Sequence, residues 1–479
     1  MSVESGFRRT VGLFDATMLI SGSMIGSGVF IVASDMIKDG HTGAFLLLAW
    51  ALTGVLTVFA ALSYGELAGI YPHAGGQYTY LREIYGPLTG FLYGWTFFAV
   101  IECGTIAAVA VGFGKYLGTF VPWVSESNWL LPALKVPELH ITSTIHLGPY
   151  NLGLTSARLS GIAIVLLLSF VNRFGVKLGS RIQNVFTIAK IGSLLALVLA
   201  GIFLKPSVPA DPSPYVPPAA EALTSLPFLI ALLVTQTNSL FSADAWNSIT
   251  FIAGEVKEPR RTIPLSLLIG TGLVCGLYFL ANFGYLRVLG PNAIAAAPNS
   301  RVGSAAVQAI FGSAGGKVMA GAILVSMFGC VNGLVLAGAR VYHTMADDGV
   351  FIAKAGGLNQ YGVPGFSLAI QAVWTCLLTM SGTYGQLLDY VVFAALLFYV
   401  LTVLGVIILR VRQPELDRPV KVFAYPFLPV LYLAGALAIM AALLIYKPAF
   451  TWPGLVIVAT GVPLYYLSKR EVVASNPAT

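Results

Sequence analysis

The chain has 479 residues, of which 57% are hydrophobic and only 10% are charged. Soluble domains have about 25% charged residues, so this composition excludes a soluble globular protein. The net charge of +7 does not indicate nucleic-acid binding, because Lys and Arg lie in short clusters between apolar stretches, as membrane topology signals do.

Apolar stretches of about 20 residues, long enough to cross the hydrocarbon core of a bilayer, recur along the whole chain. They predict a single all-α, multi-pass membrane domain over residues 1–479. The twelve predicted transmembrane helices lie at 12–36, 43–70, 87–121, 154–172, 182–204, 226–256, 262–288, 317–346, 366–382, 384–410, 424–446 and 451–468.

The connecting segments alternate in charge from one side of the membrane to the other. Most Lys and Arg residues, such as Arg173, Lys257 and Arg412, fall on one side. The positive-inside rule makes that side the cytoplasm and places both termini there, as an even number of helices also requires. Arg8 and Arg9 precede a long first helix without a cleavage site, so we expect a retained helix in the cell membrane rather than a signal peptide.

Four connecting segments carry expectations of their own. On the outside, 122–153 is proline-containing and is expected to form an ordered loop, 205–224 is rich in Pro and Ala, and 289–316 is expected to hold a short helix. On the inside, 72–86 is amphipathic and unusually rich in polar and aromatic residues. It predicts an elbow that lies along the membrane interface.

The first predicted helix contains three glycines and three serines between Ser21 and Gly28. Glycine costs about 1 kcal/mol relative to alanine inside a helix, so a continuous helix is unfavourable here. One interpretation is an unwound segment whose free N–H groups line a cavity and bind a carboxylate. The other is close packing between helices, because Gly22 and Gly26 also form a small-xxx-small pattern. This stretch alone leaves both open.

The sixth predicted helix is interrupted in the same way. Residues 235–247 are mostly polar or aromatic, which is unfavourable in hydrocarbon unless they face a cavity or partner groups. Asp244 lies near the middle, where it could cap a second half-helix that begins near Ala245. Breaks in the first and sixth helices occupy corresponding places in two sets of five. This pattern predicts an inverted-repeat transporter with its binding site at the breaks.

Two more charged residues lie inside predicted helices. Lys190, two turns into the fifth helix, either extends its ammonium to the inner interface or contacts the carbonyls freed by the break in the first helix. In the second case it stands where a coupling cation would bind. Glu102, deep in the third helix, is a candidate proton site, a partner for a buried cation, or a residue that faces an outer cavity.

Motifs of soluble enzymes are absent from the sequence. There is no phosphate-binding Gly-x-x-x-x-Gly-Lys, no His-Glu-x-x-His and no cluster of histidines. All cysteines fall inside apolar segments, where cysteine behaves as a small hydrophobic residue, so we expect no disulfide framework. We therefore expect a protein that is not an enzyme, with no catalytic residue, metal or cofactor.

Several motifs, in collinear order from about residue 10 to 470, resemble the amino acid–polyamine–organocation (APC) superfamily. They also resemble prokaryotic members of its L-type amino acid transporter (LAT) family, most of all in the last motif. The motifs are IGSGVF at 25–30, GGQYTY at 75–80, FSADAWN at 241–247, GEVKEPRRTIP at 254–264 and RQPELDRPVKV at 412–422.

The resemblance implies a LeuT-type fold with broken helices 1 and 6. Its two inverted five-helix repeats would cover about 10–204 and 225–411, and helices 11 and 12 about 424–469. The backbone of the first break would bind a substrate carboxylate, and carbonyls of the second would bind the amino group. Phe241 would be the gating aromatic, and Lys190 would replace a bound cation. The implied substrate-binding residues are Ile25, Gly26, Ser27, Gly28, Phe241, Ser242, Ala243, Asp244 and Asn247.

The chain departs from the family pattern at two positions. The family often has an aromatic residue at position 243 and glycine at position 245, whereas this chain has Ala243 and Ala245. Ala243 would enlarge the pocket or change its polarity, and Ala245 would stiffen the break. The identity of the substrate side chain therefore stays open, and Asp244 could favour a cationic substrate. The family's animal members pair with a glycoprotein through a cysteine in the loop between helices 3 and 4. Segment 122–153 has no cysteine, so no disulfide-linked heavy subunit is expected.

The leading hypothesis is sodium-independent exchange of L-amino acids by alternating access. The first alternative is proton-coupled amino acid symport, with Glu102 or Asp244 as the proton carrier. The second, from another class, is an amino acid sensor that binds its ligand without transporting it.

Overall fold

The computed structural model describes residues 9–38, 42–137, 139–140, 146–147, 150–206, 225–382 and 384–475. Helices occupy each of the twelve predicted segments, two of which are broken. The helices are α1 (Leu13–Met24), α2 (Gly28–Ile37), α3 (Gly43–Ile70), α4 (Gln77–Tyr85), α5 (Pro87–Thr96), the π-helix η1 (Phe97–Ile101), α6 (Glu102–Leu117), α7 (Ser156–Asn172), α8 (Val176–Phe203), α10 (Leu226–Ser242), α11 (Ser248–Phe251), η2 (Ala253–Glu255), α12 (Pro259–Ala295), η3 (Pro298–Ser300), α13 (Val302–Asp347), η4 (Ala353–Gly356), α14 (Gly365–Ser381), α15 (Tyr384–Arg412), α16 (Phe427–Tyr446) and α17 (Pro448–Ser475).

The helices have the length and composition of a multi-pass membrane protein. Among the described residues, eight helical segments are long and apolar enough to cross a bilayer, and α7, α10 and α14 are shorter apolar helices. Large hydrophobic side chains are exposed on the outer surface of the bundle, for example Leu166 on α7 and Leu199 on α8. Such exposure suits a hydrocarbon surrounding and not water.

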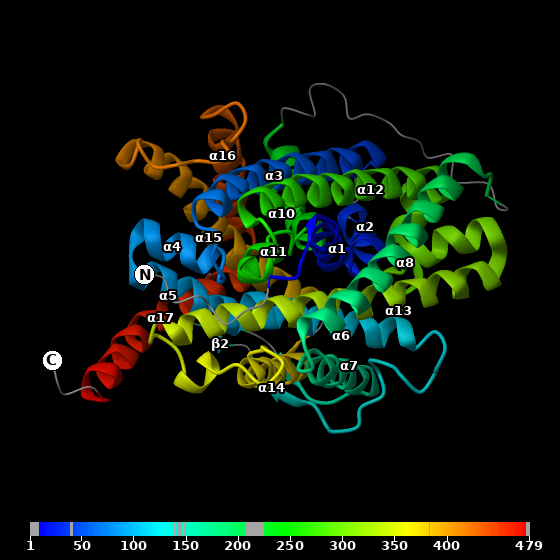
Figure 1. Ribbon diagram of the computed structural model, residues 1–479. Helices are drawn as coiled ribbons and strands as arrows, with labels where there is room; N and C mark the ends of the chain where they lie inside the picture. The colour runs from blue at the N-terminus through cyan, green and yellow to red at the C-terminus, as the bar shows by residue number, and fades with distance from the viewer. Residues whose placement is uncertain are drawn as a thin grey trace.

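The broken first segment lies at the centre of the bundle. Figure 1 shows α1 and α2 with α3, α10 and α12 on one side and α6 and α13 on the other. Every residue in the apolar window of this segment is buried, whereas only 33% of the window in α8 is buried. The chain therefore encloses its most polar, glycine-rich helix in protein and exposes its apolar helices.

Both predicted breaks are present. Ile25 leaves the helical conformation with φ −75° and ψ 89°, and α2 begins three residues later. After α10, Ala245 has a left-handed conformation with φ 65°, and the next helix begins only at Ser248, after Asn247. The prediction that Asp244 caps a half-helix near Ala245 is therefore wrong, because the left-handed turn delays the helix and directs Asp244 elsewhere.

One connecting segment differs from the predictions. The chain is not entirely helical, because β1 (Leu134–Val136) pairs with β4 (Tyr150–Leu152), and β2 (Leu139–His140) pairs with β3 (His146–Leu147), both antiparallel. In segment 289–316, the backbone at Gly290 and Gly312 is not helical, so α12 and α13 are each kinked there. The first part of α13, between Val302 and the kink at Gly312, is the short helix that was predicted in this segment. Most of segment 205–224 lies outside the described residues.

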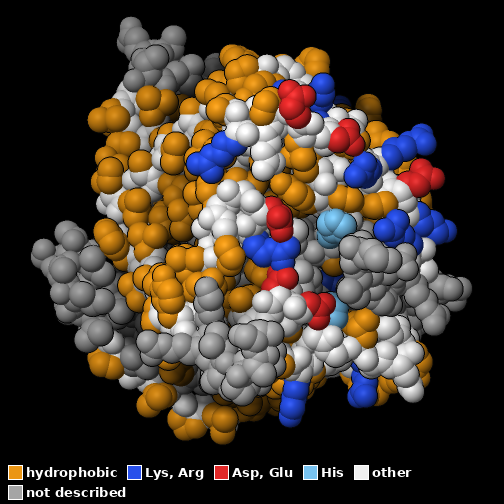
Figure 2. Space-filling model, turned by 60° about the vertical axis from the view of Figure 1, so that its left-hand side comes forward, with side chains coloured by type: hydrophobic (Ala, Val, Ile, Leu, Met, Phe, Trp, Pro, Cys, Tyr) orange, Lys and Arg blue, Asp and Glu red, His pale blue; other side chains and the backbone are white. Residues whose placement is uncertain are grey.

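Charged side chains gather on the end of the bundle that is on the left in Figure 1, and hydrophobic ones cover much of the remaining face in Figure 2. The predicted elbow forms α4 at this end. Asp348, just beyond α13, accepts hydrogen bonds from Tyr78 and Arg82. Burial and the nearby Asp348 carboxylate both raise the pKa of Tyr78, so its hydroxyl stays a neutral donor. The elbow is thus fixed to the end of α13.

Candidate functional site

The break between α1 and α2 is held by Lys190 of α8. Its ammonium donates to the carbonyl oxygens of Gly22 at 2.5 Å and Ile25 at 2.9 Å, and to that of Ser326 in α13 at 3.2 Å. The side chain is only 1% exposed, so it does not reach the interface as the snorkelling alternative requires. One buried cation therefore links three elements at the break.

The other carbonyls freed by the break also have side-chain donors. The Tyr278 hydroxyl of α12 donates to Met24 O at 2.8 Å, and the Cys330 thiol of α13 lies 2.9 Å from Ser23 O. The Ser326 hydroxyl adds a second donor to Ile25 O, at 3.0 Å. Carbonyls from Ser23 to Ile25 lack the amide partners of a continuous helix, so these side chains replace the missing hydrogen bonds.

The two broken segments meet where α2 begins. A Cβ atom on Gly28 would lie 2.2 Å from Ser242 Oγ and 2.8 Å from Ser242 Cα, so only glycine fits there. On the other side of the break, Gly26 faces the Cys330 sulfur, which a Cβ would approach to 3.0 Å. The start of α2 thus lies beside the last residues of α10, and in its first turn the amide of Phe30 donates to Ser27 O at 3.1 Å.

The second break carries a polar network. The Tyr399 hydroxyl donates to Asp244 Oδ1 at 2.6 Å. The Asn247 amide donates to Gln77 Oε1 at 3.2 Å, and the Gln77 amide donates to the Thr402 hydroxyl at 3.0 Å. Both breaks are therefore packed against side chains of neighbouring helices, in the second case from α4 and α15.

Glu102 shares a small cavity with this network. The cavity has a volume of only about 10 Å³, and its lining includes Gln77, Glu102, Asp244 and Asn247. Glu102 is 4% exposed, and its Oε1 has no hydrogen-bond partner among the described residues. It directly follows the π-helix η1, a kind of bulge that is frequent at functional sites. Two carboxyl groups therefore face one enclosed space.

The remaining predicted residues fall in two places. Ile25, Gly26, Ser27 and Gly28 form the break in the first helix and its continuation. Phe241, Ser242 and Ala243 end α10 and are buried. The polar residues before them serve packing, because the Thr53 hydroxyl lies 2.8 Å from Gln236 Oε1 and 2.6 Å from Ser239 Oγ.

One buried ion pair near the site was not predicted. Arg340 of α13 donates to Glu255 at 2.9 Å, and both side chains are at most 2% exposed. The Glu255 carbonyl accepts from the amides of Thr10 and Val11 at 2.8 and 3.0 Å. The chain that precedes α1 is thereby fixed to the segment after α11.

Residues missed by the sequence analysis share one property. Tyr278, Ser326, Cys330 and Tyr399 lie in helices whose sequences are ordinary apolar spans. Only Glu255 lies within a recognisable motif, at 254–264. No pattern at these other positions distinguishes a side chain that faces the break from one that faces lipid.

The chain is similar to known proteins along almost its whole length. The family described as amino acid permease matches residues 11–468. The serine/threonine exchanger SteT of Bacillus subtilis (strain 168) is 29% identical over 471 residues, covering 98% of this chain and 98% of that protein. The b(0,+)-type amino acid transporter 1 of Mus musculus is 26% identical, covering 97% of this chain and 88% of that protein. The large neutral amino acids transporter small subunit 2 of Homo sapiens is 28% identical, covering 96% and 80% respectively.

Proposed function

Because this chain belongs to the amino acid permease family, within the APC superfamily, we propose that it exchanges L-amino acids across a membrane by alternating access, without sodium. The observation that carries the sodium-independent mechanism is the ammonium of Lys190 on the carbonyls of Gly22 and Ile25. Unwound carbonyls of this kind coordinate Na⁺ in other transporters. A fixed ammonium fills that place and leaves no cation to drive net uptake.

The substrate would bind between the two breaks. Helix N-termini attract anions and C-terminal carbonyls attract cations. In our proposal the first amides of α2, with the backbone from Ile25 to Gly28, hold the carboxylate. The carbonyls that end α10, near Phe241 and Ser242, hold the amino group. Phe241 covers the site, and Ala243, Asp244 and Asn247 lie close to the substrate.

The printed names of the relatives support the substrate class. All three concern amino acids, and that of SteT states exchange of serine and threonine. The names of the relatives differ in the substrate side chains that they imply. We therefore propose for this chain only that its substrates are amino acids and that it exchanges them.

We also propose that the chain has the LeuT-type topology in the cell membrane, with twelve crossings in two inverted repeats plus two helices. Both termini would lie in the cytoplasm. Helices at all twelve expected positions support this proposal. We propose further that the chain works without a disulfide-linked subunit and performs no enzymatic reaction, since segment 122–153 has no cysteine and the relatives are named as transporters.

Counterflow into proteoliposomes tests the exchange mechanism. The purified chain is reconstituted with or without unlabelled serine, leucine or lysine inside, and uptake of each labelled amino acid is measured in sodium-free buffer. We expect internal substrate to stimulate uptake at least tenfold, and sodium to change nothing. Equal uptake into empty vesicles would contradict exchange. Ligand-dependent thermal stabilisation without any flux would indicate a sensor.

Proton-coupled symport is a second candidate, favoured by one observation. Glu102 has a carboxylate oxygen without a hydrogen-bond partner among the described residues, in the cavity that also contains Asp244. Two negative charges in one enclosed space repel, so one of the two carboxyl groups is suited to hold a proton. Uptake into empty vesicles that rises with an inward proton gradient, and that Glu102→Gln abolishes, would support this mechanism over exchange.

A further inference from the structure

The carboxyl groups of Glu102 and Asp244 lack the cationic partner that other enclosed carboxyl groups of the bundle have. Glu255 pairs with Arg340 at 2.9 Å, and the buried Glu66 pairs with an arginine of α15 at 2.6 Å. In the part of the chain that the structure describes, no Lys, Arg or His forms a salt bridge with Glu102 or Asp244. An enclosed carboxylate without a cation is costly, so this place is short of positive charge.

Acceptor oxygens beside Glu102 also lack donors. Glu102 Oε1 and Gln371 Oε1 of α14 are buried, and neither has a hydrogen-bond partner among the described residues. The two oxygens border the same space, because a Cβ atom on Gly338 would lie 2.9 Å from the first and 2.7 Å from the second. Asp244 accepts from the Tyr399 hydroxyl. The group that complements these oxygens is a cation with several N–H donors.

The open space between the two carboxyl groups is small. The cavity that Glu102 and Asp244 line has a volume of about 10 Å³, and a single water molecule needs about 10–15 Å³. A second cavity of about 30 Å³ shares Asp244 and Tyr399 with the first and reaches Ala243, directly after α10. A primary ammonium is about as large as a water molecule. The space therefore suits an ammonium better than the wider guanidinium group or any ring.

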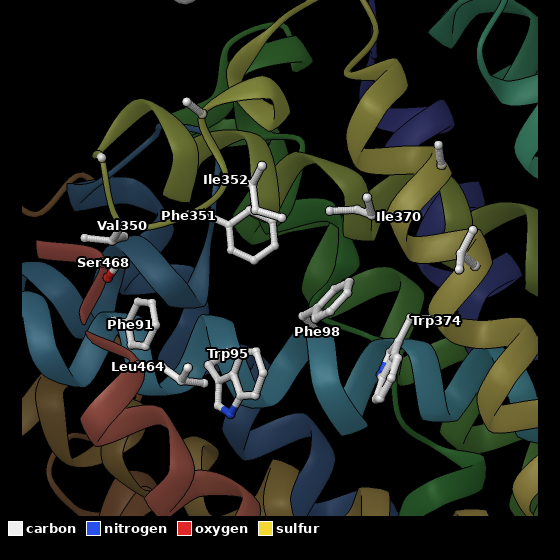
Figure 3. Close-up of a pocket in the computed structure, with 14 residues that line it drawn as sticks. Phe91, Trp95, Phe98, Val350, Phe351, Ile352, Ile370, Trp374, Leu464 and Ser468 are labelled. Carbon is white, nitrogen blue, oxygen red and sulfur yellow. The ribbon is translucent and has the colours of Figure 1, made fainter. Parts of the chain in front are cut away.

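A much larger cavity elsewhere in the bundle offers no such chemistry. It has a volume of about 910 Å³, and Figure 3 shows aromatic side chains such as Phe98 and Trp374 around it. None of the described residues that line it is charged. A cation would lose its water there without gaining a partner, which is costly. The place for a cation is therefore the small space beside Glu102.

We infer that the substrate carries a primary ammonium in its side chain, as ornithine and lysine do, and that Glu102 and Asp244 select it. The inference rests on the proposed function, whose substrate class it narrows. Asp244 lies two residues after Ser242, which contacts the start of α2, so at most about 7 Å of chain separates Asp244 from the breaks. An ammonium has three donors and can serve both carboxylates at once, whereas a proton neutralises only one of them.

Ornithine and norleucine test the inference, because they differ only in the last group of the side chain, an ammonium in one and a methyl in the other. Binding of each to the purified full chain is measured by calorimetry in detergent, and exchange of each is measured separately in proteoliposomes. We expect ornithine to bind at least tenfold more tightly than norleucine. Equal affinity for the two amino acids would overturn the inference.

Two variants and one control assign this preference to the carboxyl groups. In Glu102→Gln and in Asp244→Asn we expect the preference for ornithine to fall at least fivefold, since each amide keeps the shape of the side chain and loses its charge. Glu126→Gln removes an exposed carboxylate from the loop after α6 and should keep the preference. An undiminished preference in both site variants would overturn the role of the two residues. The comparison in the unmodified chain decides the substrate class even where a variant does not fold.

Binding and exchange together separate this inference from the proposed function. Tight binding of ornithine without any exchange would contradict the proposed function and leave the substrate class intact. Exchange of norleucine as fast as that of ornithine, at equal affinity, would retain the function and overturn the inference. Proton uptake together with norleucine in that case would assign the two carboxyl groups to symport instead.

Discussion

At the scale of single residues, the Lys190 ammonium is the group on which the first break depends most. It is buried and serves the carbonyls of Gly22, Ile25 and Ser326. In Lys190→Ala these carbonyls lose the ammonium as a donor, although Ile25 O keeps the Ser326 hydroxyl. Each buried group that is left unsatisfied costs about 1–3 kcal/mol. We expect exchange to fall at least tenfold and the variant to unfold at a lower temperature. We also expect Na⁺ to raise its unfolding temperature, because the vacated carbonyls are ligands for a hard cation.

Lys205→Ala is the matched control, since Lys205 follows the other end of α8 and is exposed. It should exchange like the unmodified chain, and Na⁺ should not stabilise it. Unchanged exchange by Lys190→Ala would contradict the cation-substitute role. So would an unfolding temperature of Lys190→Ala that Na⁺ raises no more than choline does.

Ala245 is the second residue with a testable cost. Its φ of 65° lies in the left-handed region, which costs an L-residue roughly 1–2 kcal/mol relative to glycine. We expect Ala245→Gly to unfold a few degrees higher than the unmodified chain, as measured by thermal unfolding in detergent. Ala243→Gly is the control, because Ala243 has φ −92° and gains nothing from glycine. A lower unfolding temperature for Ala245→Gly would show that the left-handed turn is not strained.

The residues themselves differ in how far the sequence reveals them. The breaks could be predicted because a dense cluster of Gly and Ser in the first helix, and polar residues with an Asp in the sixth, interrupt otherwise apolar stretches. Tyr278 and Cys330 were not readable, because their partners Met24 and Ser23 are more than 250 positions away in the chain. A tyrosine or cysteine in an apolar helix has many possible environments, and only the packing of the bundle selects one.

At the scale of elements, the contact between α2 and α10 joins the two broken segments. Gly28→Ala would place a Cβ within 2.8 Å of the Ser242 Cα atom, a backbone atom that cannot move away easily. We expect the variant to lose exchange at least tenfold, because the two halves of the substrate site would be pushed apart. Exchange and substrate-induced thermal stabilisation are the measurements.

Two further variants separate this contact from a general intolerance of alanine. Gly276→Ala in α12 meets nothing within 4 Å and should exchange normally. Adding Ser242→Gly to Gly28→Ala removes the nearest side-chain atoms and should restore part of the activity. Full activity of Gly28→Ala alone would mean that the breaks are not tightly packed in the working protein.

Elements were predictable to different degrees for a physical reason. The long helices follow from uninterrupted apolar stretches, and all twelve segments are helical. The one-turn helix α11 and its late start at Ser248 could not be predicted from the sequence, because an alanine such as Ala245 does not indicate a left-handed turn. The strands of β1–β4 and β2–β3 are only two or three residues long, which is too short for an alternating pattern to be recognised in a sequence.

At the scale of the whole molecule, the family and the amino acid transport were predicted from motifs and are confirmed by the relatives. The number of crossings and the orientation remain predictions, because length and composition do not record which side of a membrane a loop occupies. Lys and Arg gather with Asp and Glu at one end in Figure 2, as expected for a surface outside the hydrocarbon.

Orientation can be tested with single cysteines. All four native cysteines are free and lie within helices, so we would replace them first and check that exchange persists. Cysteines are then introduced at two exposed positions, Gln413 after α15 and Ser127 after α6. In right-side-out membrane vesicles, a membrane-impermeant maleimide should label Ser127→Cys at once and Gln413→Cys only after the membrane is permeabilised. Inside-out vesicles should reverse the order. Labelling of both positions from the same side would require an even number of crossings between them, and would contradict the proposed topology, in which seven crossings separate Ser127 from Gln413.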